Sequence, residues 1–143
     1  MKQITKTRKA VATMANELRK LGYTLSKAFK TAWRRIKEGM TVKAIGVTFG
    51  NRQNLLQFIA GRKPEELTVY LRRDRANVFD KYAVAIVIGI KGVEYAHIGY
   101  LPKGLAQSVA IVIDNGIEFH ADAKVIGGYG HKETYGALIN IAV

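Results

Sequence analysis

The chain has 143 residues, which is enough for one domain with a hydrophobic core or for a small domain plus an appendage. Hydrophobic residues make up 48% of it, which excludes a disordered tail. It has no cysteine, which excludes disulfides and thiolate zinc sites and fits a reducing compartment. The formal net charge is +12, and residues 1–43 hold 12 Lys and Arg against 2 acidic residues, a net of +10. Such a concentration attracts polyanions; a merely solvated basic surface is the alternative.

The first 40 residues are predicted to form a basic helical hairpin. Residues 3–21 place apolar side chains at helical spacing, and Gly22 ends that helix. Thr24 suits the N-cap of a second helix over residues 25–38. Its apolar positions form one continuous stripe: Leu25, Ala28, Phe29, Ala32, Trp33 and Ile36. Its other face is basic and could contact phosphates through Lys27, Lys30, Arg34 and Arg35. Trp33 is expected to anchor the hairpin against the rest of the protein or a partner chain.

The period of the apolar residues changes after Gly39, so we place a boundary there, with a hairpin at 1–40 and a second domain at 41–143. Two helices are predicted in the second domain, at 51–60, where Leu55, Leu56, Phe58 and Ile59 would face inward, and from Pro102 to about residue 114. Strands are predicted at 41–49, 67–73, 83–90, 95–101, 117–126 and 135–142. This order predicts an α+β fold whose sheet curls into a small barrel.

Two neighbouring segments carry the residues of a predicted pocket. Asn77 and Asp80 flank Phe79 directly before a buried strand, and Tyr100 precedes a helix that has Lys103 in its first turn. An aromatic wall, a hydrogen-bond acceptor and a cation suit the end of a nucleic acid better than a chemical reaction. The alternatives are that Asp80 merely caps an Asx-type turn and that the phenylalanines are ordinary core residues.

Signals for catalysis are weak. The histidines (His97, His120 and His131) lack metal-ligand spacing, and neither serine stands in a nucleophile-elbow pattern. Residues 127–132 are better explained as a hairpin turn than as a phosphate-binding loop. No apolar run is long enough to span a bilayer, and no secretory signal is visible. We therefore expect a soluble cytoplasmic protein that is not an enzyme and needs no metal or cofactor.

Four segments, 46–53, 67–74, 77–85 and 98–106, resemble the HIRAN domain in order and spacing. The resemblance covers residues 42–127. It implies an OB-like β-barrel with two flanking helices. HIRAN domains occur fused to SNF2-type helicases of DNA repair and as stand-alone proteins in bacteria and phages. In the helicase-fused examples the domain binds the 3′-hydroxyl end of single-stranded DNA.

The resemblance also implies binding residues. Asn77, Phe79 and Asp80 match the family's Asn-Pro-Tyr-Asp segment, with Val78 in place of proline. The other matching positions are Phe49, an aromatic position after the first strand, and Tyr100 and Lys103 at the pocket rim. The best-known end-binding members have an arginine where this chain has Thr48, and tyrosines where it has Phe49 and Phe79, so stacking is kept and hydroxyls are lost. Arg52 could supply the missing cation, and Arg72 could contact phosphate beside the pocket.

The sequence thus predicts a DNA-binding module that holds single-stranded DNA, more readily than double-stranded DNA, and possibly at a 3′-hydroxyl end. A protein-interaction module is the alternative, in which the apolar stripe forms a homodimer or docks on a helicase or nuclease. A third interpretation is duplex binding through the basic hairpin, with the barrel as a scaffold.

Overall fold

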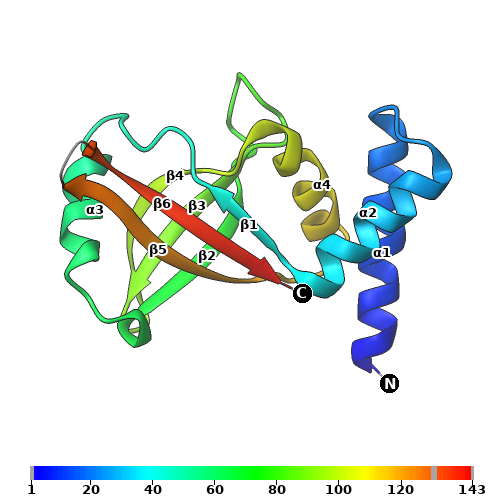
Figure 1. Ribbon diagram of the computed structural model, residues 1–143, viewed down its shortest axis with the longest axis horizontal. Coiled ribbons are helices and arrows are strands. Elements are labelled where there is room, and N and C mark those ends of the chain that lie inside the picture. The colour runs from blue at the N-terminus through cyan, green and yellow to red at the C-terminus, as the bar shows by residue number, and fades with distance from the viewer. Residues whose placement is uncertain (1, 130–131, 143) are drawn as a thin grey trace.

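The computed structural model describes residues 2–129 and 132–142 (Figure 1). The helices are α1 (Lys2–Lys20), α2 (Leu25–Glu38), α3 (Arg52–Ala60) and α4 (Lys103–Asp114), with a 3-10 turn at Pro64–Glu66. The strands are β1 (Met40–Lys43), β2 (Leu67–Arg73), β3 (Val84–Ile90), β4 (Val93–Tyr100), β5 (His120–Tyr129) and β6 (Lys132–Ala142). The predicted α+β class and the predicted order of the elements are confirmed. The strand predicted at 117–126 lies three residues further along the chain, and the last strand begins at Lys132 and not at residue 135.

The strands form two antiparallel three-stranded sheets, in the orders β1-β6-β5 and β2-β3-β4. An isolated bridge between Ile45 and Tyr100 connects the end of the first sheet to the edge of the second. Among the described residues, the strand pairing does not close into a barrel. Residues 130–131 lie outside the described residues, and the other residues of the turn predicted at 127–132 belong to the ends of β5 and β6.

The predicted strand over residues 41–49 is too long. Regular pairing ends at Lys43, and residues 46–51 form turns, because Gly46 (φ 72°) and Gly50 (φ 60°) adopt the left-handed backbone that a strand does not accept. The apolar residues Val47 and Phe49 therefore belong to a loop. This change matters for function, because the loop forms one wall of the site described below.

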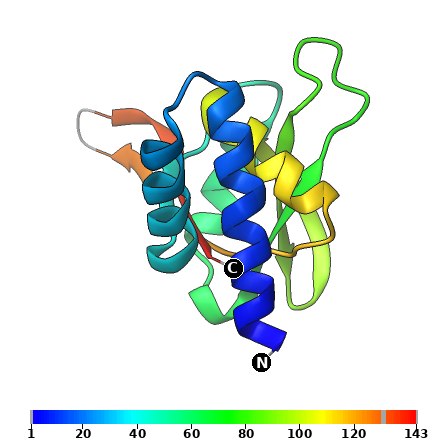
Figure 2. The same ribbon diagram turned by 90° about the vertical axis from the view of Figure 1, so that its right-hand side faces the viewer.

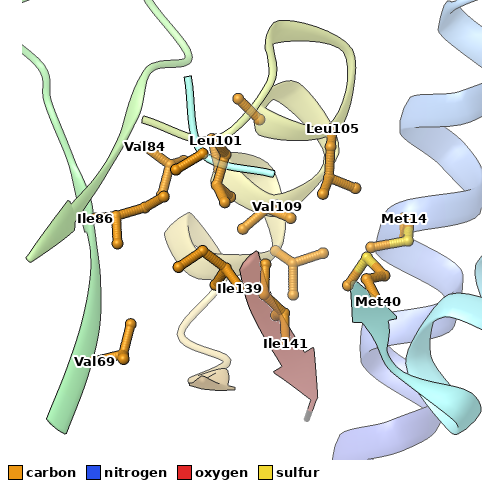
Figure 3. Packing of buried hydrophobic residues seen from close by; sticks show 14 of the residues in the cluster. Met14, Met40, Val69, Val84, Ile86, Leu101, Leu105, Val109, Ile139 and Ile141 are labelled. Carbon is orange, nitrogen blue, oxygen red and sulfur yellow. The ribbon is translucent and has the colours of Figure 1, made fainter. Parts of the chain in front are cut away.

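The helical hairpin forms as predicted, with the Thr24 hydroxyl accepting a bond from the backbone N–H of Lys27. It packs at one end of the molecule against α4 (Figure 2). Met14 of α1 and Met40 of β1 belong to the same buried cluster as Val109 of α4 and Ile141 of β6 (Figure 3). One hydrophobic core therefore runs from the hairpin into the sheets.

Two predicted apolar faces are only partly buried. The stripe on α2 is divided, because Ala28, Ala32 and Ile36 are buried, whereas Leu25, Phe29 and Trp33 are about half exposed. Trp33 is not part of the core cluster, so it does not anchor the hairpin against the sheets. On α3, Leu56 and Ile59 are buried as expected, but Phe58 is half exposed beneath the guanidinium of Arg62.

Candidate nucleic-acid interface

Two loops face a common hollow beside the first turn of α4. The loops are residues 44–51 and 74–83, and both lie along the upper edge of Figure 1. A cavity of about 440 Å³ is lined by Gly46, Phe49, Arg52, Ala76, Asn77, Val78, Phe79 and Tyr100. A second, of about 290 Å³, is lined by Ile45, Gly46, Asn77, Phe79, Asp80, Ala83, Tyr100, Leu101 and Lys103. Because they share four residues, we treat them as one site and call it the double cavity.

The loop 74–83 is shaped by its own polar side chains. Asn77 Oδ1 accepts hydrogen bonds from the backbone N–H groups of Phe79 (2.9 Å) and Asp80 (3.0 Å). Asp80 Oδ1 accepts one from the N–H of Tyr82 (2.9 Å), so the predicted Asx-type turn at Asp80 is present. These bonds fix the backbone of the loop tip, where the Phe79 side chain stands out into solvent.

The base of this loop is bound to α4. Arg73 and Arg75 both contact the carboxylate of Asp114, with shortest N–O distances of 3.1 and 2.7 Å. Arg73 also donates from Nη1 to the carbonyl of Ala83 (3.2 Å). The Arg73 side chain is nearly buried, and charge-assisted bonds in such a place are stronger than exposed ion pairs. The two ends of the loop are therefore held on a rigid helix.

The opposite wall carries Phe49 and Arg52. Arg52 Nη1 donates to the carbonyl of Gly46 (2.7 Å), and its guanidinium lies 5.3 Å from the ring centroid of Phe49 and 5.5 Å from that of Tyr100. The cation is therefore located between two aromatic rings of the double cavity, within the range of a cation–π interaction.

Gln53 holds this wall in place. Its Nε2 donates to the carbonyls of Val47 and Tyr135, both at 2.9 Å, and its Oε1 accepts from the N–H of Tyr135 at 2.7 Å. The side chain thus joins the loop 44–51 and the start of α3 to strand β6.

Tyr100 forms the floor between the loops. Its hydroxyl donates to Asp74 Oδ2 (2.7 Å), and burial together with this bond raises the pKa of Tyr100 above its ordinary value of 10.0. His97 packs edge-on against the ring, 4.7 Å between centroids, and its Nε2 lies 2.8 Å from the carbonyl oxygen of Gly99. Burial and the charge of Arg52 lower the pKa of His97 below 6.5, so at neutral pH the imidazole is uncharged and donates its Nε2 proton to Gly99.

The alternative that the two phenylalanines are core residues is wrong. Phe49 is 73% exposed and Phe79 is 92% exposed, and each lines the double cavity from a different loop. Exposed aromatic rings that face a hollow from two sides are suited to stack on a planar ligand.

The comparisons with known proteins identify the family of the chain. A profile of the HIRAN domain matches residues 23–136, which is most of the chain. The chain belongs to the HIRAN domain family. HIRAN domains are in general DNA-binding modules and not catalytic ones.

The match extends further toward the N-terminus than the resemblance noted in the sequence, because it includes α2. No curated protein matches the chain. Among solved structures, the protein is similar to a structural-genomics target from Lactobacillus plantarum, at 18% sequence identity and a TM-score of 0.47, covering 72% of this chain and 93% of that one.

Seven of the residues predicted for the HIRAN site line the double cavity: Phe49, Arg52, Asn77, Phe79, Asp80, Tyr100 and Lys103. Arg72 does not. It lies over the ring of Tyr70 and lines another cavity, of about 560 Å³, between β2 and the segment 116–119. The basic residues Lys27, Lys30, Arg34 and Arg35 are on α2 and line neither part of the double cavity.

The sequence reasoning missed the residues that position this site. Asp74, Gln53 and Asp114 make the bonds that hold Tyr100, the loop 44–51 and the loop 74–83. Asp74 and Gln53 stand inside the segments that resemble the family, which was the available signal. Asp114 is distant in sequence from the loop it binds, so no local pattern indicated it.

The described residues contain no group of three or more His, Asp or Glu side chains that could hold a metal ion. No helix in the described part of the chain is long and apolar enough to cross a membrane.

Proposed function

We propose that this HIRAN domain binds single-stranded DNA without catalysing a reaction, and that it holds the 3′-hydroxyl end of the strand in the double cavity. The observation that carries the proposal is the pair of exposed rings, Phe49 and Phe79, which line one hollow from opposite loops, with the Arg52 guanidinium beside Phe49 on one wall. Single-strand binders combine such rings with cations, and each stacked base contributes roughly 1–3 kcal/mol.

Phosphate contacts would come from both ends of the double cavity. Arg52 lies in the larger part and Lys103 in the smaller part. Lys103 is also the first residue of α4, where the helix dipole and the unpaired backbone N–H groups favour an anion. A strand whose last bases stack on Phe49 and Phe79 would therefore have a cation near each of its terminal phosphates.

Asp80 supplies the reason to propose a hydroxyl end. It lines the smaller part of the double cavity, and an ionised carboxylate accepts hydrogen bonds but donates none. Its Oδ1 already binds Tyr82, and a carboxylate has further acceptor positions. A terminal 3′-hydroxyl can donate to it, whereas a terminal 3′-phosphate would be repelled by its charge.

The two sheets support the loops of the double cavity. We propose that the two sheets, connected by the Ile45–Tyr100 bridge, are an open form of the OB-like barrel expected for the family. The exposed basic residues of α2, Lys27, Lys30 and Arg34, would add sequence-independent affinity for more distant phosphates, whereas Arg35 is partly buried.

The test is fluorescence anisotropy of the full chain with three strands of equal sequence: one ending in a 3′-hydroxyl, one ending in a 3′-phosphate, and one circular. We expect the tightest binding to the hydroxyl end, and we expect Asp80→Asn to remove the preference while keeping salt-sensitive binding. Phe58→Ala, which removes an exposed ring on α3 outside the double cavity, is the matched control and should bind like the wild type. Equal binding to all three strands would refute end recognition, and the absence of salt-sensitive binding would refute the function.

A further inference from the structure

Helix α2 exposes a second, unrelated set of large apolar side chains. Leu25, Phe29 and Trp33 are 53, 46 and 47% exposed, and their four-residue spacing places them in one row along the helix. We call this row the α2 ridge. It lies on a helix that lines neither part of the double cavity, so it does not belong to the proposed DNA site.

The form of the ridge indicates a helical partner. Rows of side chains at i, i+4 and i+8 are the ridges that fit into the groove between the rows of another helix. The buried side of α2, with Ala28, Ala32 and Ile36, is already used for packing inside the protein. The α2 ridge therefore offers the remaining apolar side of the helix.

The charges beside the ridge restrict what that partner can be. Helical geometry places Lys30 and Lys37 next to the ridge on the side away from the buried residues, and Lys37 Nζ lies 5.1 Å from the ring centroid of Trp33. A second copy of this chain would bring another N-terminal region of net charge +10 to the same place, which opposes self-association. A helix with acidic residues beside its apolar row is complementary in both shape and charge.

We propose that the α2 ridge is a docking surface for an amphipathic helix of another protein, with Leu25, Phe29 and Trp33 as the apolar contacts and Lys30 and Lys37 paired with acidic residues of that helix. This interaction does not use the double cavity and would leave it accessible; Lys30 is the one residue that the docking surface shares with the basic residues of α2 proposed to contact distant phosphates. It would let the domain be attached to a larger protein while its DNA site stays open.

The chain provides its own reporter, because Trp33 is the single tryptophan. The probe is a synthetic amphipathic helical peptide without tryptophan, with a row of leucines flanked by glutamates; the matched probe carries lysines in place of the glutamates. In titrations of the full-length protein without DNA, we expect the acidic peptide to shift Trp33 emission to the blue, to protect it from quenching, and to bind at least about tenfold more tightly than the basic peptide. The binding should weaken with added salt.

Two variants distinguish binding at the α2 ridge from nonspecific hydrophobic binding of the peptide. Phe29→Ser should weaken binding of the acidic peptide by about tenfold or more, since it removes an aromatic ring that the bound peptide would bury. Phe58→Ser on α3 should leave the affinity for the peptide unchanged. A thermal melt checks that both variants are folded.

Three results would overturn the proposal. One is an unchanged Trp33 emission with the acidic peptide, or equal affinity for the two peptides. The second is a blue shift that appears on raising the protein concentration alone, with a dimer in light scattering, which would make the occupant a second copy. The third is a blue shift with phosphatidylserine vesicles and none with the acidic peptide, which would make the ridge a membrane-surface contact.

Discussion

The double cavity and the α2 ridge both expose aromatic side chains, but they hold them in different ways. Phe49 and Phe79 stand on two loops whose backbones are fixed by hydrogen bonds with the side chains of Gln53, Asn77 and Arg73. The α2 ridge is a row of side chains on a regular helix, and its residues line neither part of the double cavity. A concave pair of rings with a cation fits a flat base, whereas a convex row fits another helix.

This difference shows that exposed aromatic area does not define a function by itself. What surrounds the rings decides which ligand fits: Arg52, Asp80 and Lys103 at the double cavity, and Lys30 and Lys37 beside the α2 ridge. Both surfaces belong to one folded unit if the buried cluster that joins the hairpin to the sheets holds them together. Disrupting that cluster should therefore have the largest effect on stability.

Met14→Ala should produce the largest effect. Met14 is fully buried in the cluster that connects α1 to the sheets, so its truncation should lower the free energy of unfolding by about 2–5 kcal/mol. Chemical denaturation followed by circular dichroism measures this, with Asn16→Ala on the exposed side of α1 as the control. A cost below about 0.5 kcal/mol would mean that the hairpin is an appendage and that the two surfaces belong to separate units.

Gln53→Leu should affect the double cavity and spare the ridge. The change removes three hydrogen bonds and leaves the carbonyls of Val47 and Tyr135 without this donor, which should cost about 1–3 kcal/mol of stability. It should also weaken binding of single-stranded DNA, because the loop with Phe49 loses its attachment to β6. Gln57→Leu, on the exposed side of the same helix, is the matched control. Unchanged DNA affinity in a destabilised Gln53→Leu protein would show that the loop does not need to be held.

The sequence predicted the regular elements well, because their signals are local. The Thr24 cap, the end of the first helix at Gly22, and the apolar run of β3 depend on neighbours in the chain. The predicted strand at 41–49 failed because its alternating apolar residues are typical both of a half-buried strand and of a loop with exposed aromatic rings. Only the backbone of Gly46 and Gly50 separates the two.

The exposure of individual side chains was less predictable. Phe29 and Ala32 both belong to the apolar stripe predicted on α2, yet Phe29 is half exposed and Ala32 is buried, because the packed side of α2 covers only part of that stripe. At the double cavity, family resemblance indicated the lining residues, and long-range bonds such as Arg75 to Asp114 could not be derived from either segment alone.

Phe79→Ala is the most direct test of the concave site. The ring is exposed, so its removal should leave the melting temperature unchanged and should weaken single-strand binding by about 1–3 kcal/mol, or roughly 5- to 150-fold. Trp33→Ala on the ridge is the comparison variant and should leave DNA affinity unchanged, as measured by anisotropy. Equal losses in the two variants would erase the distinction between the surfaces.

Tyr100→Phe should have a smaller effect with a recognisable pH dependence. At neutral pH it removes one hydrogen bond to Asp74, worth about 1 kcal/mol of stability. The pKa of Tyr100 is raised above 10.0 in the folded protein, so the tyrosine of the unfolded chain ionises first as the pH rises. The stabilisation by the neutral Tyr100 hydroxyl is therefore fully present below pH 10.0 and is lost as the pH rises from there through the pKa of the folded protein. Urea denaturation on both sides of pH 10.0 should therefore show a smaller alkaline loss in Tyr100→Phe than in the wild type. Tyr70→Phe, outside the double cavity, is the control; the same alkaline loss in all three proteins would contradict the assignment.

The smallest effect is expected from the basic face of α2. If Lys27 and Lys30 contact phosphates, the double variant Lys27→Gln/Lys30→Gln should reduce the slope of log affinity against log salt by up to about 0.7 for each lysine, and the preference for a 3′-hydroxyl should remain. Lys91→Gln/Lys124→Gln changes the net charge equally at exposed sites away from α2 and should leave the slope nearly unchanged. An equal reduction in both double variants would mean that overall charge attracts the strand and that α2 has no particular role in DNA binding. In that case its apolar ridge would be the only specific surface on the hairpin.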